Sequence, residues 1–95
     1  MKITLHTILG IKQAVGKRQM EIEIPQGSTV EDVVAYMKDR WGEKLSPHFI
    51  DSHSGDVHPY VRIMINGRTI QFLDGMDTLL QEGDEVLILP LASGG

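Results

Sequence analysis

The sequence QEGDEVLILPLASGG at residues 81–95 decides how the rest of the chain is interpreted. A turn at residues 82–84 precedes an apolar run that predicts a strand over residues 85–91. Gly94 and Gly95 follow this strand. Glycine has no Cβ, so such a segment can enter a narrow channel and lie close to another protein's catalytic groups. Its distinctive group is the α-carboxylate of Gly95. The stretch alone is equally consistent with an idle end, because termini are where order usually fails.

The predicted final strand has two chemically different faces. Glu85 is expected to face solvent, and side chains alternate between the two faces of a strand. The outward set is therefore Leu87, Leu89 and Leu91, and the inward set is Val86, Ile88 and Pro90.

A strand predicted over residues 60–65 adds to the outward face. Arg62 marks its solvent side, which also carries Tyr60 and Met64. If the two strands are neighbours, Met64, Leu87 and Leu89 form an apolar patch that leads to the terminal glycines. Exposed apolar patches mark interaction sites. The alternative is that the domain itself covers both faces of the final strand.

The N-terminal part of the chain predicts a β-hairpin. Residues 2–9 alternate in polarity, with Ile3 and Leu5 on one face. Residues 18–24 alternate in the same way and end at Pro25, because proline cannot donate a hydrogen bond to a sheet ladder. Residues 10–16 are expected to form a glycine-containing loop between the two strands.

One helix is predicted after this hairpin. Ser28 with Glu31, or Thr29 with Asp32, has the spacing of a capping box. An apolar stripe follows at helical spacing, which predicts a helix packed on a sheet and ended by Gly42. The stripe consists of Val30, Val33, Val34, Met37 and Trp41.

The remaining elements complete a small mixed sheet. Residues 45–59 are irregular, and Asn66-Gly67 predicts a type I′ hairpin turn between residues 60–65 and a return strand at 68–72. One helical turn is expected at residues 78–80. This order predicts an α+β fold of about five strands with one main helix on one face, the β-grasp arrangement, with the final strand parallel to the first. Residues 1–95 are expected to form one domain with a flexible tail at 92–95.

Composition excludes several function classes. The 95 residues carry a net charge of −4, which argues against nucleic-acid binding. No stretch approaches the roughly 20 apolar residues of a membrane span, so a cytoplasmic protein without a membrane partner is expected. Cysteine is absent, which removes disulfides, zinc–thiolate sites and thiol nucleophiles.

Several of these features, in this order, resemble the MoaD/ThiS family of ubiquitin-like sulfur carriers, and most of all the small subunit of molybdopterin synthase. The features are Asn66-Gly67, the run Gln81-Glu82-Gly83-Asp84-Glu85-Val86, Leu89-Pro90 and Gly94-Gly95. Two features depart from the family's pattern. Leu91 stands where a second proline is often found, and residues 45–59 look like an insertion.

The resemblance implies a role for the terminal glycines. The Gly95 carboxylate would be adenylated by an E1-like adenylyltransferase that uses ATP, and then converted to a thiocarboxylate, with Gly94 as a spacer. A persulfide on another protein would supply the sulfur, and the large subunit of molybdopterin synthase would receive it. The chain would be a sulfur-carrying co-substrate that binds no cofactor of its own, rather than a complete enzyme.

The residues expected to bind partners lie on the outward face and beside the tail. They are Met64, Leu87, Leu89, Leu91, Pro90, Arg62 and Arg68. Both arginines have ordinary solubility as their simpler explanation. His48, His53 and His58 could bind a metal ion, but their spacing fits neither a helix face nor a strand face, so no metal site is predicted.

Three alternatives to a molybdopterin role stay open. The chain could carry sulfur for thiamine synthesis or tRNA thiolation. It could be a modifier joined through Gly95 to lysines of other proteins. It could also be a non-covalent ubiquitin-like binding module in which the tail does nothing.

Overall fold

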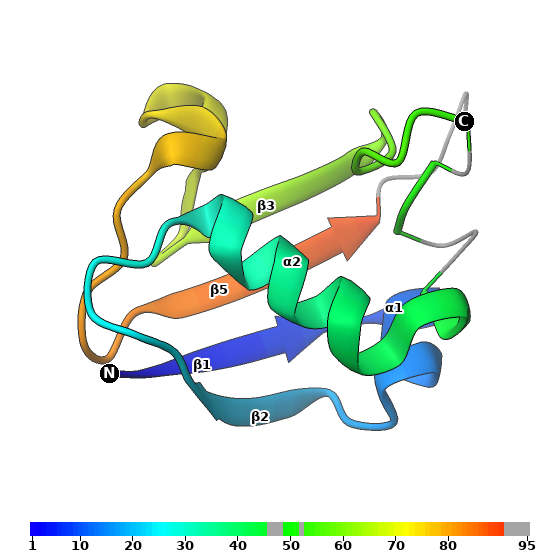
Figure 1. The fold of residues 1–95 in the computed structure, drawn as a ribbon, viewed down its shortest axis with the longest axis horizontal. Coiled ribbons are helices and arrows are strands. Elements are labelled where there is room, and N and C mark those ends of the chain that lie inside the picture. The colour runs from blue at the N-terminus through cyan, green and yellow to red at the C-terminus, as the bar shows by residue number, and fades with distance from the viewer. Residues whose placement is uncertain (46–48, 52, 91–95) are drawn as a thin grey trace.

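The structure is a computed structural model that describes residues 1–45, 49–51 and 53–90. Five strands form one sheet in the order β2-β1-β5-β3-β4 (Figure 1). β1 and β5 are parallel, and the other neighbouring pairs are antiparallel. The strands are β1 (Lys2–Thr7), β2 (Gln19–Glu23), β3 (Val61–Ile65), β4 (Arg68–Thr69) and β5 (Glu85–Pro90). The predicted β-grasp arrangement is confirmed.

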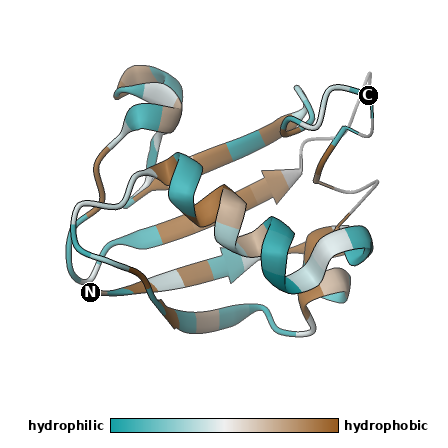
Figure 2. Cartoon of the chain, in the orientation of Figure 1, coloured by the Kyte–Doolittle hydropathy of each residue, from teal (hydrophilic) through white to brown (hydrophobic). Residues whose placement is uncertain are grey.

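Helix α2 (Val30–Trp41) lies across one face of the sheet, as Figure 1 shows. Its stripe packs into the core, where Val30, Val33 and Met37 are almost fully buried. Burial of this stripe, rather than helix propensity alone, fixes the helix on the sheet. Along the strands, apolar and polar residues alternate (Figure 2).

The start of α2 resolves the choice between two capping boxes. Thr29 is the N-cap: its Oγ1 accepts from the backbone N–H of Asp32, and Asp32 Oδ2 accepts from the backbone N–H of Thr29 at 2.8 Å. Ser28 is buried and donates to the carbonyl of Pro25 instead. Gly42 ends the helix as predicted, with φ of 47°.

The predicted loop at residues 10–16 is wrong. The first strand ends at Thr7 instead of residue 9, and α1 (Leu9–Val15) follows, ended by Gly16 with φ of 91°. Ile11 is completely buried, so α1 closes one end of the core. Only one residue of this short helix is buried, which left no helical stripe for sequence reasoning to detect.

Two smaller predictions after the Asn66-Gly67 turn are also wrong. Both turn residues have positive φ, 51° and 86°, as a type I′ turn requires. The return strand, however, covers only β4, and the 3₁₀ turn η2 (Ile70–Phe72) replaces its second half. The helical turn expected at residues 78–80 lies earlier, as η3 (Gly75–Asp77).

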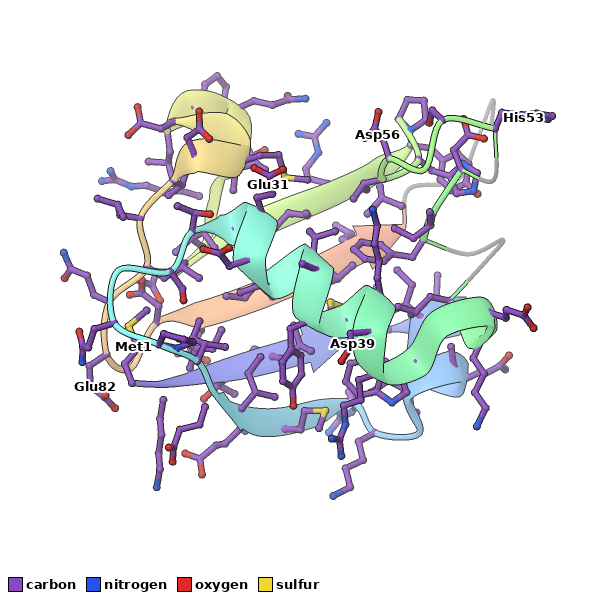
Figure 3. All side chains as sticks on the ribbon, viewed as in Figure 1. Met1, Glu31, Asp39, His53, Asp56 and Glu82 are labelled. Carbon is purple, nitrogen blue, oxygen red and sulfur yellow. The ribbon has the colours of Figure 1, made fainter. Side chains whose placement is uncertain are left out.

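The segment at residues 45–59 adds more to the core than its composition suggests. A 3₁₀ turn, η1 (Gly42–Lys44), leads into it, and Leu45 and Phe49 are fully buried. Lys38 Nζ on α2 donates to the carbonyl of Gly55 at 2.6 Å and holds the far part of the segment. Figure 3 shows His53 and Asp56 at the end of the molecule opposite Met1 and Glu82. None of the helices in the described ranges has the length and apolar character needed to cross a membrane.

Candidate functional site

β5 is the central strand, and its two faces differ as predicted. Val86 and Ile88 are fully buried, whereas Leu87 and Leu89 are only half-buried. Tertiary structure therefore confirms the alternation read from the sequence. It places one apolar set in the core and the other on the sheet face away from α2.

The register across the sheet brings the outward residues of three strands together. Leu87 is paired with Met64 of β3 on one side and with His6 of β1 on the other. Leu89 is paired with Arg62. We call these five residues the outer face. All five side chains are half-buried, so the patch exposes less apolar area than fully exposed side chains would.

Sequence reasoning did not include two residues of this surface. Ile8 has extended backbone angles, φ −140° and ψ 163°, so it continues the outward set of β1 after His6. Ile8, His6 and Leu87 line one broad hollow of about 490 Å³ together with Arg18 and Asn66. Extending the period-2 pattern of residues 2–9 to Ile8 would have found it.

A second addition is Phe72, whose side chain is 85% exposed. It lines a hollow of about 410 Å³ with Arg62, Met64 and Arg68. Arg68 thereby lines the same hollow as Arg62 and Met64 of the outer face, and its role in partner binding stays a prediction. An exposed phenylalanine in a 3₁₀ turn has no periodic signal, so the sequence could not assign it to this surface.

Charges on the outer face are arranged by strand. Arg62 and Arg68 lie on the side of β3 and β4, and Glu21 lies on the opposite side, paired with Thr4. His6 Nε2 and Glu85 Oε1 are 2.8 Å apart between these two sides. The surface is therefore an apolar band with two arginines on its β3–β4 side, which can orient a partner that carries negative charge.

The tail residues predicted to carry the chemistry, Gly94 and Gly95, lie outside the described residues, as does Leu91. Pro90 is the last residue of β5, and its side chain is also outside the described set. In the sequence, residues 91–95 follow Pro90, the last residue of the central strand. Their roles stay predictions.

The histidine-rich segment is arranged around a carboxylate. The backbone N–H of His53 donates to Asp51 Oδ1 at 3.0 Å and lowers the pKa of that carboxyl. The nearby His53 and His58 rings lower the pKa further. The His58 ring stacks on Tyr60 at 4.6 Å between centroids. Within residues 1–45, 49–51 and 53–90, no group of three potential metal ligands comes together, and His48 lies outside these ranges.

The sheet order, the parallel pairing of β1 with β5, and the single main helix define a ubiquitin-like β-grasp protein. The ThiS family matches residues 8–95. The chain belongs to this family of ubiquitin-like sulfur carriers, which is the MoaD/ThiS group that the motifs indicated.

Three similar proteins illustrate the family. Small archaeal modifier protein 3 of Haloferax volcanii is 30% identical over 95 residues, which is the full length of both chains. The sulfur carrier protein CysO of Mycobacterium tuberculosis is 31% identical over 70 residues, 73% of this chain and 74% of its own. A solved structure from Pyrococcus furiosus, provisionally described as molybdopterin converting factor subunit 1, has a TM-score of 0.73 and 27% identity. That match covers 97% of this chain and 99% of the Pyrococcus chain.

Proposed function

We propose that this sulfur carrier holds sulfur as a thiocarboxylate on Gly95 and delivers it to a pterin precursor bound to a molybdopterin synthase large subunit. The observation that supports this most is the position of β5. Its outward residues Leu87 and Leu89 belong to the apolar outer face, and the predicted tail follows without interruption. A partner bound to that face would hold the start of the tail.

The length of the tail suits delivery into a partner's active site. Gly95 is five residues beyond Pro90 (95 minus 90). An extended chain covers about 3.3–3.6 Å per residue, so the carboxylate can reach roughly 17 Å from the end of β5. The sequence Leu91-Ala92-Ser93-Gly94 has only small side chains after Leu91, which lets it enter a narrow channel.

Formation of the thiocarboxylate uses two partner proteins, an E1-like enzyme and a persulfide donor. A Gly95 carboxylate oxygen attacks the α-phosphorus of ATP on an E1-like enzyme, which forms the acyl-adenylate and releases pyrophosphate. The outer sulfur of a protein persulfide then attacks the acyl carbon and expels AMP. A thiol cleaves the resulting acyl disulfide, leaving the thiocarboxylate on Gly95 and a disulfide on the donor side. Covalent activation divides one difficult substitution into easier steps.

Intact-mass spectrometry tests the carrier chemistry. The chain is incubated with an E1-like enzyme, ATP and a persulfide donor. A gain of about 16 mass units, the exchange of one oxygen for sulfur, is expected from the proposed covalent route. A variant lacking Gly95 serves as the matched control and should not gain this mass. An unchanged mass for the complete chain under conditions that modify a known sulfur carrier contradicts the proposal.

The docking role of the outer face is tested separately. Leu89→Asp places a carboxylate in the apolar band and should weaken binding to a large subunit while leaving adenylation largely unchanged. Ala35→Asp adds the same charge on the exposed side of α2 and is the control. Equal binding of both variants, measured by calorimetry, would show that partners do not use the outer face.

The modifier role is the second candidate, and the match to small archaeal modifier protein 3 over the full length of both chains favours it. In this role the activated Gly95 carbonyl is attacked by a lysine amine of another protein and forms an isopeptide bond. Adducts that carry the Gly95–lysine linkage in cells, and that disappear when Gly95 is deleted, would support it. Both roles use the same activated Gly95 carboxylate, so the variant lacking Gly95 is the control for both tests.

A further inference from the structure

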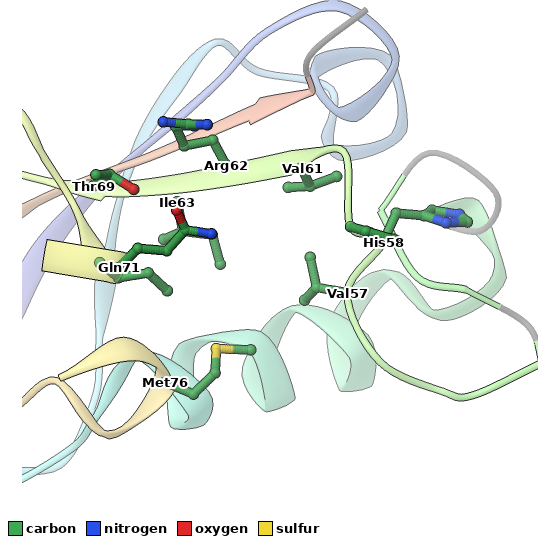
Figure 4. A pocket seen from close by; sticks show the side chains of 10 residues that line it. Val57, His58, Val61, Arg62, Ile63, Thr69, Gln71 and Met76 are labelled. Atoms are coloured by element: carbon green, nitrogen blue, oxygen red, sulfur yellow. The ribbon is translucent and has the colours of Figure 1, made fainter. Parts of the chain in front are cut away.

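A second recess lies at the edge of β3 that faces away from β5, and it reaches from Arg62 of the outer face toward α2. It is a pocket of about 210 Å³. Figure 4 shows Ile63, Val61 and Gln71 on its β3 side, Met76 below and Val57 at its far end. The walls combine apolar and polar side chains, and three separate segments of the chain contribute to them.

Thr69 borders both this pocket and the hollow beside Phe72, and its hydroxyl is unpaired. Its side chain is only 7% exposed, and within the described residues its Oγ1 has no hydrogen-bond partner. The other buried side-chain atom in this condition is Nε2 of His58, which also lines the pocket. Buried polar atoms are normally hydrogen-bonded. Two unpaired atoms at one pocket therefore indicate that a polar group of a bound molecule pairs with them.

The pocket adjoins a strand edge that is only partly covered. β4 pairs with β3 at Met64 and Ile65 alone, and the backbone N–H of Val61 donates to the carbonyl of His58 at 3.0 Å. Within the described ranges, Ile63 is therefore the residue of this edge that no strand covers. Asn66 donates its backbone N–H to Glu85 of the β5 ladder. Because backbone groups alternate between the two sides of an antiparallel strand, those of Ile63 point away from β5.

From these observations we infer that the pocket is a docking site for an extended peptide segment of a partner protein. The segment adds to the β3 edge at Ile63, and one aliphatic side chain enters the pocket. At about 210 Å³ the pocket is smaller than the roughly 300–1,000 Å³ of sites for free small molecules. The pocket has room for a single side chain. When a peptide adds a strand to the edge of a sheet, its main-chain hydrogen bonds provide affinity and such side-chain pockets provide specificity.

The geometry specifies the central residue of that segment. In an antiparallel pair, the residue opposite Ile63 exchanges backbone hydrogen bonds with it and directs its own side chain to the same side of the sheet. Ile63 is buried on the α2 side, where the pocket lies. The peptide residue opposite Ile63 therefore needs a free N–H, which bonds to the Ile63 backbone, and an aliphatic side chain, which enters the pocket. A polar main-chain group of the segment meets the Thr69 hydroxyl.

The test uses the ¹⁵N-labelled full chain and the capped peptide acetyl-Lys-Val-Leu-Val-Lys-amide. Saturable shifts are expected for the amides of Val57, Ile63 and Thr69. Two control peptides keep the same charges. Leucic acid at the centre puts an ester oxygen in place of the N–H and so removes only that donor, and alanine removes most of the aliphatic side chain. Each should weaken binding about tenfold, since either a hydrogen bond or a buried side chain is lost.

Variants of the protein complete the test. Thr69→Val keeps the shape and removes the hydroxyl, so it should weaken the peptide about five- to tenfold while raising the unfolding midpoint of the free protein. Met76→Trp should block the pocket. Ala35→Asp on the exposed side of α2 should bind the peptide like the unaltered chain.

Three results would overturn the inference. The first is the absence of saturable shifts up to the solubility limit of the peptide. The second is a set of shifts centred on Leu87 and Met64 instead of the β3 edge. The third is equal affinity of Thr69→Val and the unaltered chain. None of these results affects the mass gain expected at Gly95, so failure here is distinguishable from failure of the proposed function.

Discussion

Backbone conformation decides the effect of substitution at two residues, one in a turn and one at the start of a helix. Gly67 has φ of 86° in the β3–β4 turn, and nothing lies within 4 Å of the position a Cβ would take. Leu9 has φ of 55° at the start of α1 and is 65% exposed. At both residues the left-handed backbone, rather than packing, controls stability. Replacing Gly67 should therefore lower the free energy of unfolding, whereas placing glycine at Leu9 should leave it unchanged or raise it.

Gly67→Ala should destabilise the protein by about 1–2 kcal/mol, the cost of the left-handed conformation for a residue with a Cβ. Gly67→Asn is the control, because asparagine tolerates this conformation and should lose clearly less. Urea unfolding followed by circular dichroism measures both. Equal losses for alanine and asparagine would mean that space, not φ, limits this turn.

Leu9→Gly should leave stability unchanged or raise it by up to about 1 kcal/mol, although glycine normally weakens a helix. Its exposed side chain contributes little burial, and relief of the positive φ offsets the entropy that glycine loses. Lys12→Gly, in the interior of the same helix, is the control and should lose about 1 kcal/mol. A comparable loss at both positions, in thermal unfolding, would rule out strain at Leu9.

At the level of elements, the capping box and the central strand give the clearest tests. Thr29→Ala removes the N-cap of α2 and should cost about 1 kcal/mol. Glu31→Ala changes an exposed residue in the same turn without touching the box, and it should cost clearly less. Guanidinium unfolding compares the two. If Glu31→Ala proved the more costly, the dipole interaction would outweigh the cap.

The two faces of β5 should respond differently to a charge. Val86→Asp buries an unpaired carboxylate in the core and should cost more than about 4 kcal/mol, enough to unfold much of the protein. Leu87→Asp, one residue away on the outer face, should leave a cooperative unfolding transition. Circular dichroism and NMR spectra distinguish the two outcomes. A similar loss of folded structure in both variants would mean that other parts of the protein cover the outer face.

Elements with strong periodicity could be predicted from the sequence, and those held by tertiary contacts could not. Strand alternation located Leu87 and Leu89 on one face, and the helical stripe located α2. α1 escaped because Ile11 is its only buried residue, and seven residues are too short to form a stable helix alone. The second half of the predicted return strand became η2 because its main anchor is the buried Ile70.

At the scale of the whole molecule, the candidate site combines residues that are distant in sequence. Met64 and Leu87 could be placed together because the fold class specifies the neighbours of the final strand. Thr69 and Val57 could not be assigned to one pocket, because their proximity depends on where the irregular segment at residues 45–59 folds back. Non-periodic segments carry no signal for their three-dimensional position.

The central position of β5 also affects how the protein is made. β1 and β3 are both held by β5, which is the last strand in the chain, and β1 pairs with it across about 80 residues of sequence. A chain emerging from the ribosome therefore has two separate hairpins until residue 90 is released. Such long-range pairing is slow to form compared with local contacts. An unfinished chain cannot assemble the outer face, so an activating enzyme that recognises this face would engage only molecules whose synthesis has reached the tail.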